Sequence, residues 1–221
     1  MATEGGTIGA DPSRPFEAVV LAAGAGARFG GGKLLAPYMA GVLLDGALAC
    51  AFAAPARSVT VVTGAEEAAV AQAAIRLADR LGLHDRLRMV HAADYALGMA
   101  HSLRMGIAGL PTETAGAFVF LGDMPRVPRD ILAPMAEAVR GGAEAAAPVF
   151  QGRRGNPVLL SAALFPEMLA LSGDRGARAI LDGLGDRLAL VEAPDDGVLY
   201  DVDRREDIPS AAHPGESRDP S

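Results

Sequence analysis

The chain has 221 residues, a formal net charge of −7, and hydrophobic residues at half of its positions. That length suits one domain, and that hydrophobic fraction is ample for a core. The negative charge argues against a general nucleic-acid-binding protein. Cys50 is the sole cysteine, which excludes an internal disulfide framework and a cysteine-rich zinc site.

The two ends of the chain differ from its middle. Residues 1–14 lack the apolar block of a signal peptide and are expected to form a loose leader. Residues 209–221 are polar and rich in proline, which is typical of a disordered tail. No purely apolar segment reaches the roughly 18 residues that a transmembrane helix needs. We therefore expect one domain over residues 15–208, in a cytoplasmic protein that binds neither membrane nor nucleic acid.

Short apolar runs alternate with helical patterns along the chain. Thr63 and Glu66 have the spacing of a capping box, which would start the second helix. In chain order we predict a strand over 16–22, a helix over 43–52, a strand over 59–63, a helix over 66–81, a strand over 87–91, a helix over 102–108, a strand over 117–121, a helix over 128–140, strands over 145–150 and 158–160, helices over 164–171 and 177–184, and strands over 188–192 and 199–202.

Strand–helix alternation at this spacing implies βαβ units. We therefore predict an α/β fold, a three-layer, Rossmann-like, mostly parallel sheet with helices on both faces. Ligands of such sheets bind at the carboxyl ends of the strands. The loops at 22–33, 94–102 and 122–126 should then open on the same edge.

A glycine-rich segment follows the first predicted strand. Residues 21–33 read Leu-Ala-Ala-Gly-Ala-Gly-Ala-Arg-Phe-Gly-Gly-Gly-Lys. Glycines let backbone N–H groups approach an anion closely, and Arg28 and Lys33 neutralise it, so a polyphosphate is the expected ligand. The dinucleotide-binding pattern does not fit, because Phe29 stands where its third glycine is needed. The Walker pattern does not fit either, because Leu34 follows the lysine in place of Ser or Thr.

Carboxylates follow two other predicted strands. Asp123 comes just after the strand over 117–121, where it suits Mg²⁺, a cation that takes few protein oxygens and leaves the rest of its shell to phosphates. Taken alone, Asp123 could equally cap the turn before Pro125. Asp201 and Asp203 alternate and so share one face of the last predicted strand, where either is a candidate second ligand. The alternative for both is a solvated, acidic strand end.

Three further segments carry candidate binding residues. Gly98 allows a close backbone approach, and Ser102 begins a predicted helix. Arg153 and Asn156 lie at a predicted tight turn, either as donors to a phosphate or polar heterocycle or as a charged hairpin tip. Arg175 lies in a loop that opens a helix, whose N-terminus could hold an anion.

Together these segments resemble the molybdenum cofactor cytidylyltransferase branch of the molybdopterin nucleotidyltransferases, over about residues 16–208. The glycine-rich segment is similar to the family pattern L-A-[AG]-G-x-[GS]-x-R-[FM]-G-x-x-K. Residues 201–208 are similar to its closing motif D-[IV]-D-T-P-E-D-[IL], with Arg204-Arg205 in place of Thr-Pro.

The resemblance implies a Mg²⁺-dependent enzyme that joins CMP from CTP to the terminal phosphate of molybdopterin and releases pyrophosphate. Arg28, Lys33 and Asp123 would be catalytic, and Asp203 would join Asp123 as a metal ligand. The implied nucleotide-binding residues are Leu21, Ala22, Ala23, Gly24, Gly26, Arg28, Lys33, Gly98 and Ser102, and the implied acceptor-binding residues are Arg153, Asn156 and Arg175.

The resemblance also bears on specificity and partners. Ala23 matches the Ala-Ala-Gly form of the cytidylyl enzymes, where guanylyl relatives read Ala-Gly-Gly, and one methyl group would disfavour a purine by about 1–3 kcal/mol. A molybdoenzyme is the protein client that this function implies. The alternatives are a guanylyl- or cytidylyltransferase with another phosphorylated acceptor, and a binding protein that delivers finished cofactor.

Overall fold

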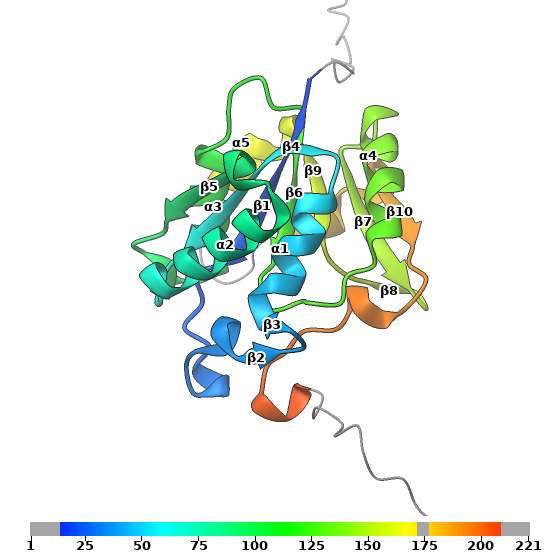
Figure 1. Cartoon of the computed structure of the whole chain (residues 1–221). Coiled ribbons are helices and arrows are strands. Elements are labelled where there is room, and N and C mark those ends of the chain that lie inside the picture. Colours follow the sequence, from blue (N-terminus) through cyan, green and yellow to red (C-terminus); the bar gives the residue numbers. More distant parts are fainter. Residues whose placement is uncertain (1–13, 172–176, 209–221) are drawn as a thin grey trace, which may run out of the picture.

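The computed structural model of the chain describes residues 14–171 and 177–208, and nearly all of the predicted leader and tail lies outside these ranges. A central sheet of eight strands runs through the molecule (Figure 1). Its strands are β1 (Phe16–Ala22), β4 (Ala56–Thr63), β5 (Leu87–His91), β6 (Gly116–Leu121), β7 (Ala145–Phe150), β8 (Arg153–Arg154), β9 (Val158–Ser161) and β10 (Leu188–Glu192). A separate small hairpin joins β2 (Pro37–Tyr38) to β3 (Gly41–Val42).

The strand order across the sheet is β5-β4-β1-β6-β9-β7-β10, with β8 paired to β7. Strand β1 lies in the middle and is parallel to both neighbours, so that Val20 is in register with Val61 of β4 and with Phe120 of β6. Only β8 and β9 run antiparallel to their neighbours within the described sheet. The prediction of a mostly parallel sheet is therefore confirmed.

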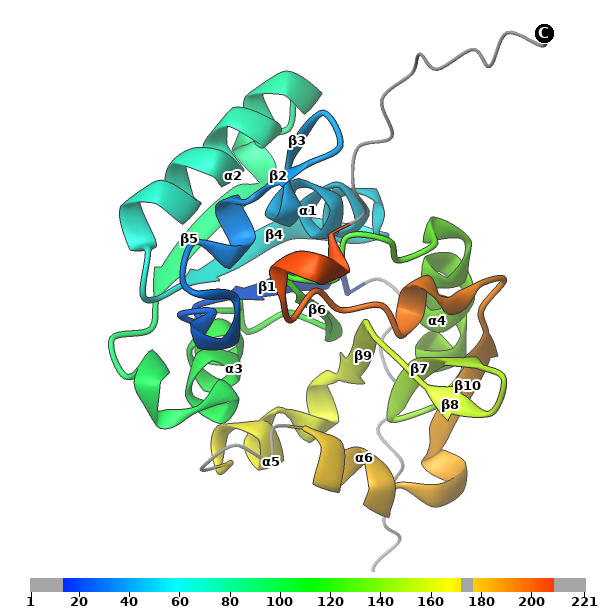
Figure 2. The same cartoon turned by 90° about the horizontal axis from the view of Figure 1, so that it is seen from below.

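Helices cover both faces of the sheet, as predicted. They are α1 (Leu43–Ala53), α2 (Glu67–Leu81), α3 (Met99–Ala108), α4 (Leu132–Arg140), α5 (Phe165–Leu169) and α6 (Arg178–Gly183). Ala18 and Val20 of β1 belong to one core cluster with buried residues of α1, α2 and α4, whereas Val19 belongs to a second core cluster with buried residues of α3, α5 and α6. This alternation is the two-residue period of a strand buried on both faces. Figure 2, viewed from below, shows α1 and α2 on one side of the sheet and α3, α5 and α6 on the other.

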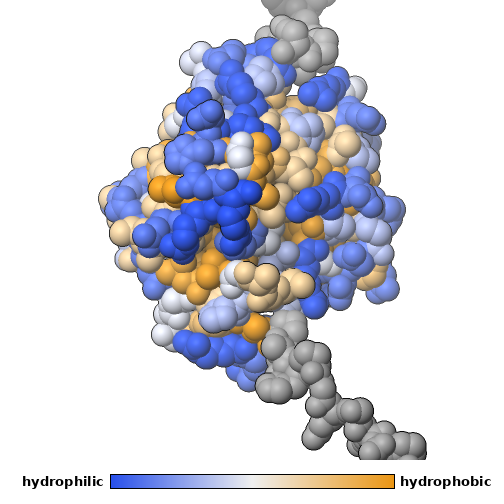
Figure 3. Space-filling model, in the orientation of Figure 1, coloured by the Kyte–Doolittle hydropathy of each residue, from blue (hydrophilic) through white to orange (hydrophobic). Residues whose placement is uncertain are grey.

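Hydrophilic residues cover the outer face of α2, next to more apolar surface (Figure 3). The opposite face of α2 buries Val70, Ala73, Ala74, Leu77 and Ala78, so the helix is amphipathic with the expected helical period. None of the helices in the described ranges has the length and apolar character that crossing a membrane requires.

Two local predictions are wrong. The predicted capping box does not form, because Thr63 ends β4 and its hydroxyl lies 3.4 Å from the Val90 carbonyl and from the His91 ring of the neighbouring strand. Helix α2 begins at Glu67 without a side-chain cap. The predicted strand over 199–202 also does not form, because this segment leaves the sheet and runs beneath it. The face shared by Asp201 and Asp203 in that strand is lost with it.

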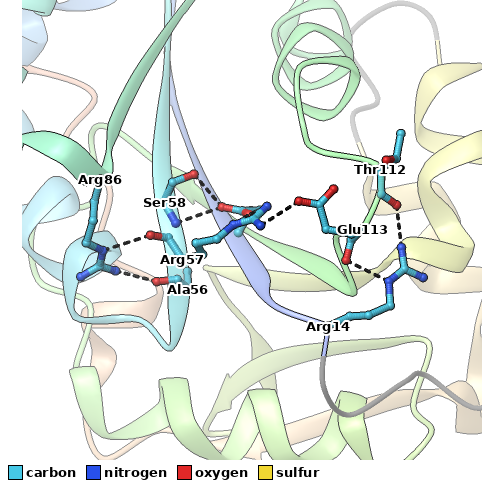
Figure 4. A network of polar contacts seen from close by, with 8 residues as sticks. Arg14, Ala56, Arg57, Ser58, Arg86, Thr112 and Glu113 are labelled. Carbon is cyan, nitrogen blue, oxygen red and sulfur yellow. Dashed lines mark hydrogen bonds and ion pairs between the residues drawn. The ribbon is translucent and has the colours of Figure 1, made fainter.

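A polar network ties together the amino ends of the central strands (Figure 4). Glu17 of β1 is fully buried, and its carboxylate accepts hydrogen bonds from Arg57 Nε at 2.7 Å, from Ser58 N at 2.9 Å and from Ser58 Oγ at 2.6 Å. Arg57 also donates to Glu113 at 2.8 Å and lowers the pKa of that carboxyl group. Arg14 donates to the carbonyls of Thr112 and Glu113. The buried carboxylate is thus satisfied by neighbours on β4.

The thiol of Cys50 is expected to be unreactive in the folded chain. Cys50 is buried in α1, and burial raises its pKa to about 12, partly offset by the charge of Arg129. Because the thiolate is the reactive form, a disulfide reagent at about pH 8 should label the native protein far more slowly than the urea-unfolded protein. Fast, stoichiometric labelling of the native protein would contradict this burial.

Candidate active site

The carboxyl ends of the parallel strands border a cleft of about 680 Å³. Its walls come from the loop after β1, the loop after β5 and the loop after β6, so the prediction that these three loops share one edge is confirmed. The lining residues are Leu21, Ala23, Gly24, Ala25, Gly26, Lys33, Leu34, Tyr95, Ala96, Gly98, Met99, Ser102, Leu121 and Asp123.

The glycine loop, residues 23–32, depends on backbone conformations that side chains disfavour. Gly26, Gly30, Gly31 and Gly32 have φ angles of 60°, 87°, 86° and 66°, which lie in the left-handed region. The backbone N–H groups of Gly24, Ala25 and Gly26 donate to no backbone acceptor within residues 14–171 and 177–208. These donors line the cleft and can bind the oxygens of an anion there.

Gly26 also makes room for Lys33. A Cβ atom at Gly26 would lie 2.8 Å from the Lys33 Cβ, whereas a Cβ at Gly30 would have no neighbour within 4 Å. We expect Gly26→Ala to displace Lys33 and to lower kcat/KM for nucleotide by about 100-fold, the effect of a misplacement of about 1 Å. Gly30→Ala carries similar backbone strain without the collision and should lose much less. Equal losses in steady-state kinetics would show that strain alone matters.

Two buried side chains anchor the glycine loop, Phe29 within it and Leu34 just after it. Leu34 packs into the main core, and Phe29 packs into a separate small cluster with Tyr38, Leu43 and Val202. The last of these belongs to residues 200–208, which we call the closing segment. The guanidinium of Arg205 in this segment lies 4.7 Å from the Phe29 ring centroid. Figure 2 shows the orange-to-red closing segment crossing in front of β1 and β6.

Two carboxylates and two cations alternate in the cleft and at its rim. Lys33 Nζ lies 2.6 Å from Asp123 Oδ2 and 3.8 Å from Asp203 Oδ1, and Arg28 Nη1 lies 3.0 Å from Asp203 Oδ2. The Lys33 and Asp123 side chains are only 13% and 23% exposed, whereas Arg28 is 78% exposed. Asp207 holds the turn that presents Asp203, since its carboxylate accepts from the backbone N–H of Asp203 at 2.9 Å.

Asp201 stands at the exposed rim of this group and makes no ion pair among the described residues. The surrounding protein removes part of its hydration, and the carboxylates of Asp123 and Asp203 lie nearby. Both effects raise the pKa of Asp201. Within the described ranges, no three His, Cys, Asp or Glu side chains gather into a metal-binding group.

A second cavity of about 710 Å³ adjoins the first, because both are lined by Leu21, Met99 and Leu121. Its floor is apolar, with side chains such as Leu103 and Leu181. Arg153, Arg154, Asn156, Arg178 and Asp182 supply polar groups. Arg154 of β8 pairs with Asp182 of α6 at 2.5 Å. The arginines outnumber the single carboxylate, so this cavity favours an anionic ligand.

The structure distributes the predicted site residues unevenly. Leu21, Ala23, Gly24, Gly26, Lys33, Gly98, Ser102 and Asp123 line the first cavity, and Arg153 and Asn156 line the second. Ala22 is buried in β1 and does not line either cavity. Arg28 and Asp203 form an ion pair with each other and are not among the residues that line the first cavity. Arg175 lies outside the described residues. Sequence reasoning missed Tyr95 and Met99, although both lie in the 94–102 loop that it selected.

The chain belongs to the family of MobA-like NTP transferase domains, whose model matches residues 18–190. It is 26% identical over 196 residues to the molybdenum cofactor cytidylyltransferase of Escherichia coli K12, covering 89% of this chain and 95% of that one. It is 30% identical over 198 residues to the nicotine blue oxidoreductase of Paenarthrobacter nicotinovorans, covering 86% and 93%.

Similar solved structures show the same fold. Rv0371c from Mycobacterium tuberculosis is 25% identical and superimposes with a TM-score of 0.74, over 88% of this chain and 96% of that one. A second structure of Rv0371c is a complex with manganese. The fold and the class of enzyme, a nucleotidyltransferase, thus agree with the resemblance that the motifs carry.

Proposed function

We propose that the chain transfers CMP from CTP to the terminal phosphate of molybdopterin, with release of pyrophosphate. The observation that carries this proposal is the alternation of Arg28, Asp203, Lys33 and Asp123 beside the glycine loop. A triphosphate and a divalent cation need these four charges in one place. The similarity to the E. coli cytidylyltransferase supports the choice of nucleotide and acceptor. The proposed compartment is the cytoplasm.

The carboxylate pair suits Mg²⁺. Its two side chains offer hard oxygen ligands, and the position of Lys33 Nζ, 2.6 Å from Asp123 and 3.8 Å from Asp203, supports a cation at this place. Asp123 and Asp203 would hold the ion, which keeps several waters and phosphate oxygens in its shell. When bound, the ion would neutralise charge on the phosphates. The manganese complex of Rv0371c supports a divalent cation in this proposal.

The chain's own residues would position the reactants and balance charge. An acceptor phosphate oxygen forms the new bond to the α-phosphorus of CTP, and the bond from that phosphorus to the pyrophosphate oxygen breaks. Backbone N–H groups of the glycine loop would bind the phosphate oxygens, and Arg28 and Lys33 would stabilise the charge that develops on pyrophosphate. A phosphate nucleophile is already ionised, so no general base is needed, and catalysis is positioning and electrostatics.

The second cavity would bind the acceptor, since it adjoins the first and is lined by apolar side chains and arginines. Arg153→Gln is expected to raise the KM for the acceptor by about 10- to 100-fold, the effect of losing one charge-assisted hydrogen bond. The KM for CTP should stay unchanged. Arg187→Gln is the control, because Arg187 pairs with Glu144 and lines neither cavity. A rise in the KM for CTP alone would place Arg153 in the nucleotide site.

Ala23 would favour cytosine over a purine. Ala23 is one of the residues that line the cleft, and a Cβ at Gly64 would come within 2.7 Å of the Ala23 Cβ, so the loop after β4 holds this methyl group in place. One fixed methyl group changes discrimination by about 1–3 kcal/mol. The proposal therefore includes a preference for CTP over GTP.

The test mixes the purified protein with Mg²⁺, molybdopterin and either CTP or GTP and measures the pyrophosphate released. The Asp123→Ala variant serves as the blank. Release with CTP that the variant loses would support the proposal. Release with GTP but not with CTP would support the proposed site residues and would contradict the role of Ala23 in selecting CTP. No release with either nucleotide would favour another phosphorylated acceptor or a delivery protein.

The oxidoreductase name of the P. nicotinovorans relative calls for a parallel assay, because one fold can carry different chemistries. Phe29 interrupts the glycine spacing that dinucleotide-dependent dehydrogenases use. We therefore expect no nicotine-blue-dependent oxidation of NADH. Such oxidation in the absence of pyrophosphate release would replace the transferase proposal.

A further inference from the structure

The cations proposed for the triphosphate already contact the carboxylates proposed for the metal. Lys33 Nζ is 2.6 Å from Asp123 Oδ2, and Arg28 Nη1 is 3.0 Å from Asp203 Oδ2. A divalent cation on the Asp123 carboxylate would lie close to the Lys33 ammonium group, and the two positive charges would repel each other. The metal and Lys33 therefore compete for Asp123.

Of the two ion pairs, the one between Lys33 and Asp123 is the stronger. Lys33 and Asp123 are largely shielded from water, so their attraction is weakly screened, and removing one partner leaves the other charge poorly solvated. Arg28 and Asp203 are more exposed, and such pairs contribute little. No other lysine occurs in the sequence, so no second ammonium group can take the place of Lys33.

We infer that metal and triphosphate bind together through an exchange of partners: Lys33 moves from Asp123 to the phosphates as the divalent cation takes the Asp123 oxygen. This inference rests on the proposed function. Without substrates, the charges of Lys33 and Arg28 offset those of Asp123 and Asp203, and Asp201 adds a further carboxylate at the rim. A metal alone adds positive charge beside Lys33, and a triphosphate alone adds negative charge beside Asp123. When both bind, the metal replaces Lys33 as the positive partner of Asp123, and the phosphates replace Asp123 as the negative partner of Lys33.

The exchange makes Lys33 a competitor of the metal in the free protein. Removing its charge should therefore tighten metal binding in the absence of nucleotide, even though it disables transfer. A lysine that merely stabilised the loop would not do so, because a disordered loop holds a metal less well. The sign of the change separates the two roles.

The test measures Mn²⁺ binding to the full chain by electron paramagnetic resonance, since Mn²⁺ takes the same oxygen ligands. For the unmodified chain, CTP should tighten Mn²⁺ binding by about tenfold or more, as expected for close charge coupling. Lys33→Met should bind Mn²⁺ alone about tenfold more tightly than the unmodified chain, and CTP should then add little. Lys33→Arg keeps the charge and should bind Mn²⁺ alone as weakly as the unmodified chain.

The double variant Lys33→Met with Asp123→Asn should lose the tighter Mn²⁺ binding of Lys33→Met. That loss would show that the additional affinity for Mn²⁺ depends on Asp123. Unchanged or weaker Mn²⁺ binding by Lys33→Met overturns the inference, as does a lack of coupling between CTP and Mn²⁺ in the unmodified chain. That second arm uses no substitution, so it holds even if a variant fails to fold. Neither arm needs turnover. Failure of the proposed function therefore shows separately, as absent pyrophosphate release.

Discussion

Asp123→Ala is expected to reduce nucleotidyl transfer by about a thousandfold, which corresponds to about 4 kcal/mol of lost transition-state stabilisation. Asp123 stands at the carboxyl end of β6 beside the glycine loop and is the nearest carboxylate to Lys33. The substitution removes a proposed metal oxygen and leaves the shielded ammonium group without its closest partner. The measurement is the initial rate of pyrophosphate release at saturating CTP and Mg²⁺.

Asp130→Ala is the matched control for this prediction. Asp130 is an exposed aspartate that lines neither cavity and makes no ion pair among the described residues. It should keep nearly full activity, and thermal unfolding should show that both variants are folded. A folded Asp123→Ala protein that kept more than about a tenth of the rate would show that Asp123 contributes less than about 1.4 kcal/mol and would remove it from the catalytic set.

Glu17→Ala is expected to cause the largest loss of stability, about 3–5 kcal/mol in the free energy of unfolding. The substitution removes a fully buried carboxylate that accepts three hydrogen bonds. It leaves the Ser58 N–H and hydroxyl buried without that acceptor and deprives Arg57 of one of its two carboxylate partners. Urea denaturation followed by circular dichroism would measure the change as a shift in midpoint at constant slope.

Glu113→Gln tests the exposed side of the same network. Glu113 shares Arg57 with Glu17, but its side chain is 53% exposed and water can replace it. Its substitution should shift the urea midpoint far less than Glu17→Ala. Equal shifts would mean that the network acts as one unit around Arg57, with no special cost for the buried carboxylate.

The sheet could be predicted from the sequence because its signals are local. The apolar run over 16–22 and the β-branched run over 59–63 fall within strands β1 and β4, and the helical patterns between them gave the parallel order. The glycine loop was equally accessible, because four of its glycines are required by their backbone conformation. These features depend on residues close together in the chain.

The wrong predictions involve segments whose local pattern is overruled by distant contacts. Thr63 has the spacing of a cap, yet its hydroxyl is used inside the sheet. Residues 199–202 read as a strand, but Val202 is drawn into the cluster around Phe29, and its N–H donates to the Asp123 carbonyl. No pattern of a few residues contains these partners.

The arrangement of charges within the site was also beyond the sequence alone. Lys33 and Asp123 are 90 positions apart, and Arg28 and Asp203 are 175 apart. Sequence motifs could name these residues as site members through a resemblance, but the pairing of each cation with a carboxylate follows only from the fold. Tyr95 shows the same limit, since an aromatic residue that lines a cleft looks no different in sequence from one in a core.

The route of the closing segment bears on when the site forms during folding. The last strand of the sheet ends at Glu192, whereas Asp203 and Arg205 come later in the chain and reach back to the glycine loop near its start. The sheet and both large core clusters are built from residues that precede the closing segment. The charge constellation would then assemble last, since contacts between residues so far apart in sequence are slow to close.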